Sequence, residues 1–103
     1  MRIKHQEDVE KQAVEAYGST GTTIQWLWDK ENDEMPNFAM RRFEIQPGGN
    51  IGLHDHPWEH EIYILAGKCK VFTPDEEVVA KEGDALYMPP DVSHGYTNDY
   101  DEV

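Results

Sequence analysis

Apolar and polar residues alternate over short stretches from Thr22 onward, and turn-forming residues interrupt them roughly every eight to twelve positions. Thr22–Trp28 is β-branched and aromatic, and Phe38–Gln46 alternates loosely. Alternation with a period of two is typical of half-buried strands. The same pattern predicts further strands at residues 51–56, 60–65, 69–73, 78–80, 85–88 and 95–97. A series of short strands predicts an all-β sandwich or barrel.

The segments between these strands carry turn and loop signals. Pro47–Asn50 (PGGN) is a strong turn signal that separates two predicted strands, and Asp29–Pro36 is predicted to be an acidic loop. Residues 1–20 are polar, and their few apolar positions between Val9 and Tyr17 fall near helical spacing. A short helix ending at Gly18 and an extended arm are both open for this stretch.

The length and charge of the chain limit its class. Its 103 residues suffice for one domain, so we expect a single domain over residues 1–103, with residues 1–20 as an N-terminal arm. The formal net charge of -12 disfavours binding to nucleic acid and to anionic membranes. No apolar run approaches the roughly 18 residues of a membrane span, and residues 1–12 lack the apolar core of a secretory signal. We therefore expect a cytoplasmic protein.

The candidate chemistry lies in the stretch HDHPWEH, residues 54–60. His54 and His56 project from the same face if this stretch begins as a strand, so two imidazoles can converge on one metal ion. His60 follows a proline corner and can return toward the same point. His94 follows a rigid Pro-Pro-Asp turn and can supply a fourth imidazole. Neutral imidazole suits zinc, copper, iron and nickel.

Each of these residues also has a simpler interpretation. A single histidine is more often a surface or hydrogen-bonded side chain, and His5, in a polar tail, is assigned to that class. The spacing His-x-His-x3-His in a strand context instead favours a metal site. Cys69 is the chain's one cysteine, which excludes an internal disulfide, and we expect it to be a buried inert thiol.

Other side chains near the histidines are candidates for the walls of a pocket. Trp58 either packs under the Pro57 corner or forms one wall of the mouth, and we expect packing. Phe38 and Met40 belong to a predicted strand and are candidate core or pocket-lining residues. Arg41 and its neighbour Arg42 can bind a substrate carboxylate, although ion pairing with the many acids of the chain is the more common outcome.

Two longer stretches carry a resemblance to a known family. Gly48–Gly67 resembles the first motif of the cupin superfamily, and Gly83–Asn98 resembles the second. The resemblance implies a jelly-roll β-barrel. Two positions depart from the usual motifs, because His60 occupies the place of the usual metal-binding glutamate and Asp91 replaces a glycine.

The first departure points to a narrower group. The chain from Pro36 onward is similar to small four-histidine manganese cupins of thermophilic bacteria. That resemblance implies a homodimer and one divalent metal per chain, manganese first, with iron, copper, nickel or zinc as alternatives. Some members cleave alkenes oxidatively with peroxide. Such cupins usually continue into another apolar strand at the point where this sequence ends, Val103, and whether the chain lacks that strand is open. The metal ligands would be the residues at His54, His56, His60 and His94.

Glu61 offers an alternative ligand set. A slip of one residue along the strand would bring Glu61 to the metal in place of His60 and restore three histidines and one glutamate. Without the slip, strand alternation turns Glu61 away from the metal. A set of neutral imidazoles leaves the charge of the ion uncompensated, which makes the ion a stronger Lewis acid and disfavours high oxidation states.

The sequence leads to two functional hypotheses. The first is a metal-dependent oxidoreductase, of dioxygenase or peroxide-using type, acting on a small apolar or aromatic molecule in the barrel. The second is a non-enzymatic cupin that binds a small ligand or whose metal is structural. A sugar or acid isomerase is disfavoured, since no clear set of barrel lysines, arginines and glutamates accompanies the histidines.

Overall fold

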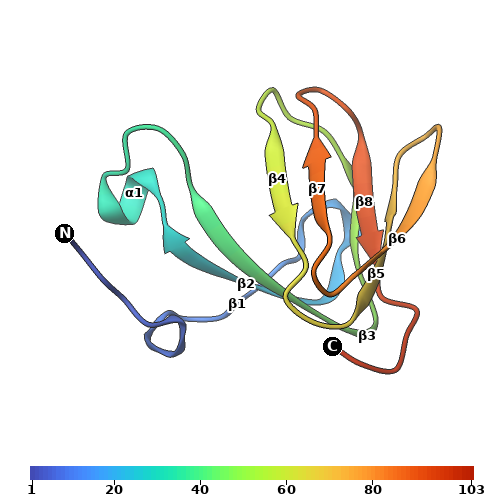
Figure 1. Cartoon of the computed structure of the whole chain (residues 1–103), viewed down its shortest axis with the longest axis horizontal. Helices are drawn as coiled ribbons and strands as arrows, with labels where there is room; N and C mark the ends of the chain where they lie inside the picture. Colours follow the sequence, from blue (N-terminus) through green and yellow to red (C-terminus); the bar gives the residue numbers. More distant parts are fainter.

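The computed structural model describes all residues, 1–103, and β-strands dominate it (Figure 1). All strand pairs are antiparallel and they form two sheets, which confirms the all-β prediction. The elements are η1 (Gln6–Asp8), β1 (Gln12–Ala13), η2 (Ala16–Gly18), β2 (Thr20–Trp28), α1 (Lys30–Asp33), β3 (Met40–His54), β4 (His60–Tyr63), β5 (Lys68–Phe72), β6 (Glu77–Lys81), β7 (Ala85–Met88) and β8 (His94–Thr97).

The six-stranded sheet has the order β1-β2-β3-β8-β5-β6, and β4 pairs with β7 in the second sheet. In Figure 1 the β2–β3 ribbon extends away from the remaining strands and ends at α1. Val71 on β5, Ala80 on β6 and Met88 on β7 form the buried apolar cluster. Because Met88 comes from the second sheet, this cluster joins the two sheets.

β3 is one continuous strand, so the prediction of a turn that separates two strands at Pro47–Asn50 was wrong. The backbone bends there without ending the strand, with Gly48 in the left-handed region at a φ of 82°. Gly48 N donates to Asn98 O at 2.7 Å and Asn98 N donates to Gly49 O at 3.0 Å. These bonds to a distant segment carry β3 from its partner β2 to its second partner β8.

The connections depart from the prediction at two further points. The strand expected to reach His56 ends at His54. The segment predicted to be an acidic loop contains the single turn α1, because Asp29 caps it by accepting a hydrogen bond from Asn32 N at 2.9 Å.

Most of the first twenty residues lie outside helices and strands. They contain two short 3₁₀ turns, η1 and η2, and the two-residue strand β1 pairs with β2. No α-helix forms in this stretch, although the 3₁₀ turn η2 ends at Gly18, where the sequence allowed a helix to stop. The only α-helix of the chain has four residues, and no helix is long and apolar enough to cross a membrane.

Candidate metal centre

The fold brings the four histidines of the predicted set together. His54 ends β3 and His94 begins β8, and the two residues lie directly opposite each other in the sheet. His56 follows in the loop, and His60 begins β4 of the second sheet. The rings of His54 and His94 lie 4.5 Å apart, those of His56 and His60 4.3 Å, and those of His60 and His94 5.6 Å. Residues far apart along the chain thus share one site.

Three of these histidines offer nitrogen atoms that lie within 4.8 Å of one another: His54, His56 and His94. In each of the three, Nδ1 lies within hydrogen-bond distance of a backbone carbonyl oxygen. The acceptors are Gly52 O at 2.7 Å, Trp58 O at 3.2 Å and Val92 O at 2.8 Å, respectively. A carbonyl oxygen can only accept, so Nδ1 carries the proton and Nε2 keeps its lone pair. This is the tautomer that a metal ligand requires.

His94 supplies an independent indication of a ligand. Only 1% of the residue is exposed, and its Nε2 atom is buried with no hydrogen-bond partner. A buried nitrogen lone pair without a partner is unfavourable unless something binds it. Burial also lowers the pKa of His94, which favours the neutral, ligating form. The three-histidine cluster is therefore compatible with one metal ion, which would occupy this orphaned lone pair.

His60 differs from the other three. Its Nε2 lies 2.6 Å from His56 Nε2, and its Nδ1 lies 2.9 Å from Nη2 of Arg41. A guanidinium can only donate, so His60 Nδ1 accepts and the ring proton of neutral His60 is on Nε2. Burial, followed by the charge of Arg41, lowers the pKa of His60 to about 4. In this arrangement His60 has no free Nε2 lone pair to offer.

The backbone under His54 is shaped by a close approach of two segments. The ring of Tyr17 stacks on the ring of His54, with centroids 4.5 Å apart and planes 9° from parallel. A Cβ at Gly52 would overlap the carbonyl group of Tyr17, so only glycine permits this contact. The sequence analysis missed Tyr17, although a glycine inside a predicted strand signals such an approach.

The turn before His94 contains Asp91 at the position of the usual glycine of the second motif. Asp91 adopts a φ of 62°, a left-handed conformation that aspartate tolerates better than most residues. Its backbone N donates to His56 O at 2.8 Å. The turn that positions His94 is thereby joined to the loop that carries His56.

Trp58 packs against one of the clustered histidines. Its ring stacks on His56 at 4.5 Å and 5° while 55% of the residue stays exposed. The expected packing under Pro57 stays a prediction, and an exposed ring stacked on His56 suits one wall of the mouth. Phe38 and Met40 are 78% and 52% exposed. Met40 begins β3 opposite Trp28, Phe38 lies between α1 and β3, and neither belongs to the histidine cluster.

Three other residues that the sequence analysis singled out have simple environments. Glu61 is exposed and lies opposite Tyr87, one residue out of step with His60. Burial raises the pKa of the Cys69 thiol to about 11, which makes it unreactive near neutral pH. His5 is exposed and only accepts a hydrogen bond from Glu7 N.

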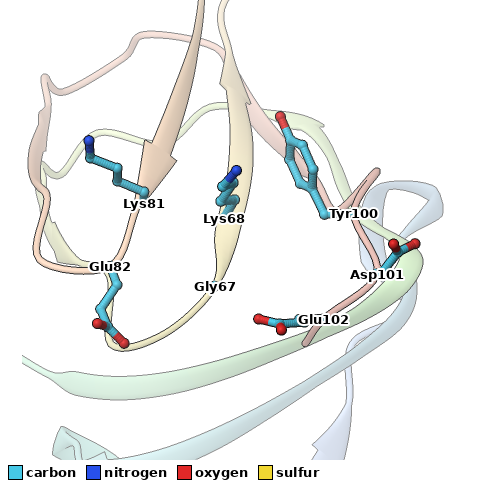
Figure 2. Close-up of a pocket in the computed structure, with 7 residues that line it drawn as sticks. All are labelled: Gly67, Lys68, Lys81, Glu82, Tyr100, Asp101 and Glu102. Carbon is cyan, nitrogen blue, oxygen red and sulfur yellow. The ribbon is translucent and has the colours of Figure 1, made fainter.

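A separate hollow of about 480 Å³ lies between the β5–β6 end and the C-terminal segment (Figure 2). Lys68 and Lys81 face each other across paired strands, and acidic residues of the C-terminal segment stand opposite them. Its lining is charged, open and of mixed sign, and none of the histidines contributes to it.

The structure combines two antiparallel sheets with a histidine cluster that is compatible with a metal ion. These two features define the class of the protein as a small all-β domain with a candidate metal site. The chain belongs to the cupin family: the family model described as "Cupin domain" matches residues 41–103. The two sheets are therefore the jelly-roll fold of this family, as the sequence predicted.

Known proteins resemble the chain at two levels. The solved structure of the polyketide cyclase RemF from Streptomyces resistomycificus superimposes with a TM-score of 0.88 at 33% identity, over 95% of this chain and 70% of that one. A predicted oxalate decarboxylase of Thermotoga maritima superimposes with a TM-score of 0.82 at 24% identity, over 98% and 90%. That second likeness concerns the fold alone.

Curated relatives share shorter stretches. The Oxalate-binding protein of Thermotoga maritima is 36% identical over 58 residues, which is 55% of this chain and 48% of the relative. Protein SchB of Streptomyces halstedii is 34% identical over 55 residues, 52% of this chain and 40% of the relative. The chain thus spans about half the length, or less, of these relatives.

Proposed function

We propose that this cupin is a metal-dependent enzyme that acts on a small, oxygen-bearing aromatic molecule, with the metal serving as a Lewis acid. The observation that carries the proposal is the set of carbonyl-bound imidazoles of His54, His56 and His94, with the Nε2 lone pair of His94 buried and unpartnered. The similarity to a polyketide cyclase over 95% of the chain supports this type of substrate.

The charge of the site favours Lewis-acid chemistry. No carboxylate belongs to the three-histidine cluster, so the ligands are neutral. A divalent ion held there would polarise a carbonyl or phenolic oxygen of the substrate. The protein's own contribution is to hold the imidazoles in one tautomer through Gly52 O, Trp58 O and Val92 O. The exposed Trp58 ring would form the aromatic wall against which such a substrate stacks.

A four-histidine manganese site remains part of the proposal and requires one rearrangement. For His60 to ligate through Nε2, its proton must move to Nδ1, where it would oppose the donor of Arg41. Arg41 must then turn away. His60 is thus a candidate fourth ligand whose recruitment depends on Arg41.

The second candidate function is the oxidoreductase that the sequence suggested, of dioxygenase or peroxide-using type. Three histidines leave coordination positions that an oxidant and a substrate can share, and imidazole ligands also suit iron and copper. A third outcome is a binding module that holds a small ligand without turnover. The similarity to a relative named Oxalate-binding protein supports this third candidate.

One experiment separates these functions. The protein is loaded with zinc or manganese, and exchange of the α-hydrogens of acetylacetone with D₂O is followed by NMR without oxygen. A parallel reaction supplies 4-hydroxystyrene and peroxide to the manganese form. We expect faster exchange with wild type than with a His94→Asn variant. Alkene cleavage without accelerated exchange would favour the oxidoreductase, and neither activity in a fully loaded sample would favour the binding module.

A further inference from the structure

Arg41 is a positive charge that the chain does not neutralise. The protein has 21 acidic residues against 9 basic ones, and its ion pairs engage the basic residues Lys4, Lys11, Arg42 and Lys70. Arg41 belongs to none of these pairs. Its one side-chain hydrogen-bond partner is Nδ1 of the neutral His60. The basic residues Arg2, Lys30, Lys68 and Lys81 also lie outside these ion pairs, but they are exposed, whereas Arg41 is partly buried. A partly buried guanidinium without an acid partner requires a separate explanation.

The neighbours of Arg41 hold its guanidinium in place without using its donors. Arg41 lies opposite Trp26 in the β2–β3 pair, with its guanidinium carbon 5.2 Å from the Trp26 ring. The same carbon lies 5.8 Å from the ring of Phe43, two residues further along β3. Aromatic neighbours of a guanidinium leave its in-plane N–H groups available for an acceptor. The side chain is partly buried, and burial lowers its pKa.

The adjacent residue shows the contrast. Arg42 donates to Glu44 Oε1 at 2.6 Å and to Gln25 Oε1 at 3.1 Å, so its charge is matched within the sheet. Strand alternation places Arg41 on the opposite face, where it reaches His60 at the metal-compatible centre. Of two successive arginines, one stabilises the protein surface and the other presents free donors beside the candidate site.

We infer that Arg41 binds a carboxylate of the small molecule that enters the histidine centre. A guanidinium presents paired N–H donors in a plane, which match the two oxygens of a carboxylate. The substrate carboxylate would supply the negative partner that the partly buried guanidinium of Arg41 lacks within the protein. This inference rests on the proposed function for the site and adds to it the chemical class of the substrate, an aromatic or other small carboxylic acid. Arg41 would therefore be a specificity-determining residue.

The test compares benzoate with benzamide, which has nearly the same shape and no charge. Binding to the zinc-loaded protein is measured by titration calorimetry, and zinc content is measured separately by elemental analysis. The variants are Arg41→Met, Arg41→Lys and the matched control Arg42→Met, in which Glu44 still pairs with Lys11. Sulfate is added as a competitor to separate recognition of a carboxylate from general attraction of anions.

We expect wild type to bind benzoate more tightly than benzamide. Arg41→Met should weaken benzoate binding about tenfold or more, the loss expected for a charged hydrogen-bond pair, and should leave the zinc content unchanged. Arg41→Lys, which keeps the charge but loses the fork, should fall between the two, and it remains informative if the methionine variant does not fold. Arg42→Met should stay within about twofold of wild type.

Several results would overturn the inference. They are equal binding of benzoate by wild type and by a zinc-loaded Arg41→Met variant, equal binding of benzamide and benzoate by wild type, and full displacement of benzoate by equimolar sulfate. Wild-type protein that takes up no zinc would instead contradict the proposed metal function. In that case the same titrations on the metal-free protein still decide the role of Arg41, because its contact with His60 involves no metal.

Discussion

His94 and His60 approach the same point from opposite sheets, yet their Nδ1 atoms face partners of opposite character. His94 on β8 faces the carbonyl oxygen of Val92, an acceptor, at 2.8 Å. His60 on β4 faces the guanidinium of Arg41, a donor, at 2.9 Å. The carbonyl oxygen keeps the proton of His94 on Nδ1, so the Nε2 lone pair of His94 is free. The guanidinium keeps the proton of His60 on Nε2, so His60 has no free lone pair there. In a histidine cluster, the partner of the remote nitrogen therefore decides which rings are ready to bind a metal.

The comparison predicts that replacement of His94 causes the largest loss of metal affinity. His94→Asn should weaken metal binding by at least about 100-fold, beyond the range expected when only a hydrogen-bond partner of a ligand is removed. Competition with a chelator, followed by elemental analysis, measures the change. His5→Asn is the matched control and should bind metal like wild type, because His5 is exposed and remote in sequence from the cluster.

Replacement of His60 sharpens the comparison. His60→Asn should change metal binding by less than about tenfold, because His60 offers no lone pair of its own. Its Nε2–H occupies the Nε2 lone pair of His56, and the metal must displace this hydrogen bond. The same chelator competition measures the change. A loss as large as that of His94→Asn would instead assign His60 to the ligand set. It would mean that metal binding displaces Arg41.

The pH dependence of stability should expose the same difference in the metal-free protein. The pKa of His60 in the folded state is about 4, below the ordinary value of 6.5, so the unfolded state binds a proton first as pH falls. The contribution of His60 is complete above pH 6.5 and is lost as pH falls from there toward 4. We expect about 1 kcal/mol over this window, less than the full shift because the ring is partly exposed.

Urea unfolding of wild type and His60→Asn at several pH values measures this contribution. The difference between the two curves cancels the acidic groups with lowered pKa values, such as Glu44 and Asp33. A difference that does not change between pH 6.5 and 4 would contradict the role assigned to burial and to Arg41.

The sequence predicted the features of the fold that depend on local pattern. Ala85–Met88 was predicted with the bounds that β7 has, because alternation and flanking turns define a short strand. The Pro47–Asn50 segment was misinterpreted because its backbone groups bond to Asn98, about fifty positions later, and local turn chemistry contains no sign of that partner. The long-range hydrogen bonds keep the segment within β3, so the residues that signal a turn form a bend in a continuous strand.

The same distinction applies to the site. His54, His56 and His60 were identified from their spacing. His94 was identified from the rigid turn before it, and the structure brings all four together. The contact between Arg41 and His60 depends on the register of two strands in different sheets, so no local pattern reveals it. The sequence offered both arginines as equal candidates, and only the fold separates them.

Trp58 should have a modest effect. Its backbone carbonyl, which holds His56 Nδ1, survives substitution, and only the stacked ring is lost. Trp58→Ala should therefore weaken metal binding by about two- to tenfold, which corresponds to the roughly 0.5–1.5 kcal/mol of an aromatic pair. Chelator competition measures this, with Trp58→Phe as the control that keeps a ring. A loss near that of His94→Asn would show that the side chain, rather than the carbonyl, positions His56.

The smallest effect is expected at Glu61, and it tests the register of β4. His60 lies opposite Met88 and Glu61 opposite Tyr87, which leaves Glu61 exposed on the outer face. A slip of one residue would exchange these faces and make Glu61 the ligand. Glu61→Ala should change metal binding less than about twofold, as should the control Glu59→Ala, whose carboxylate accepts from the hydroxyl of Tyr87. If Glu61→Ala lost more affinity than His60→Asn, the slipped register would be correct, and the contact of Arg41 with His60 would not exist in the metal-bound protein.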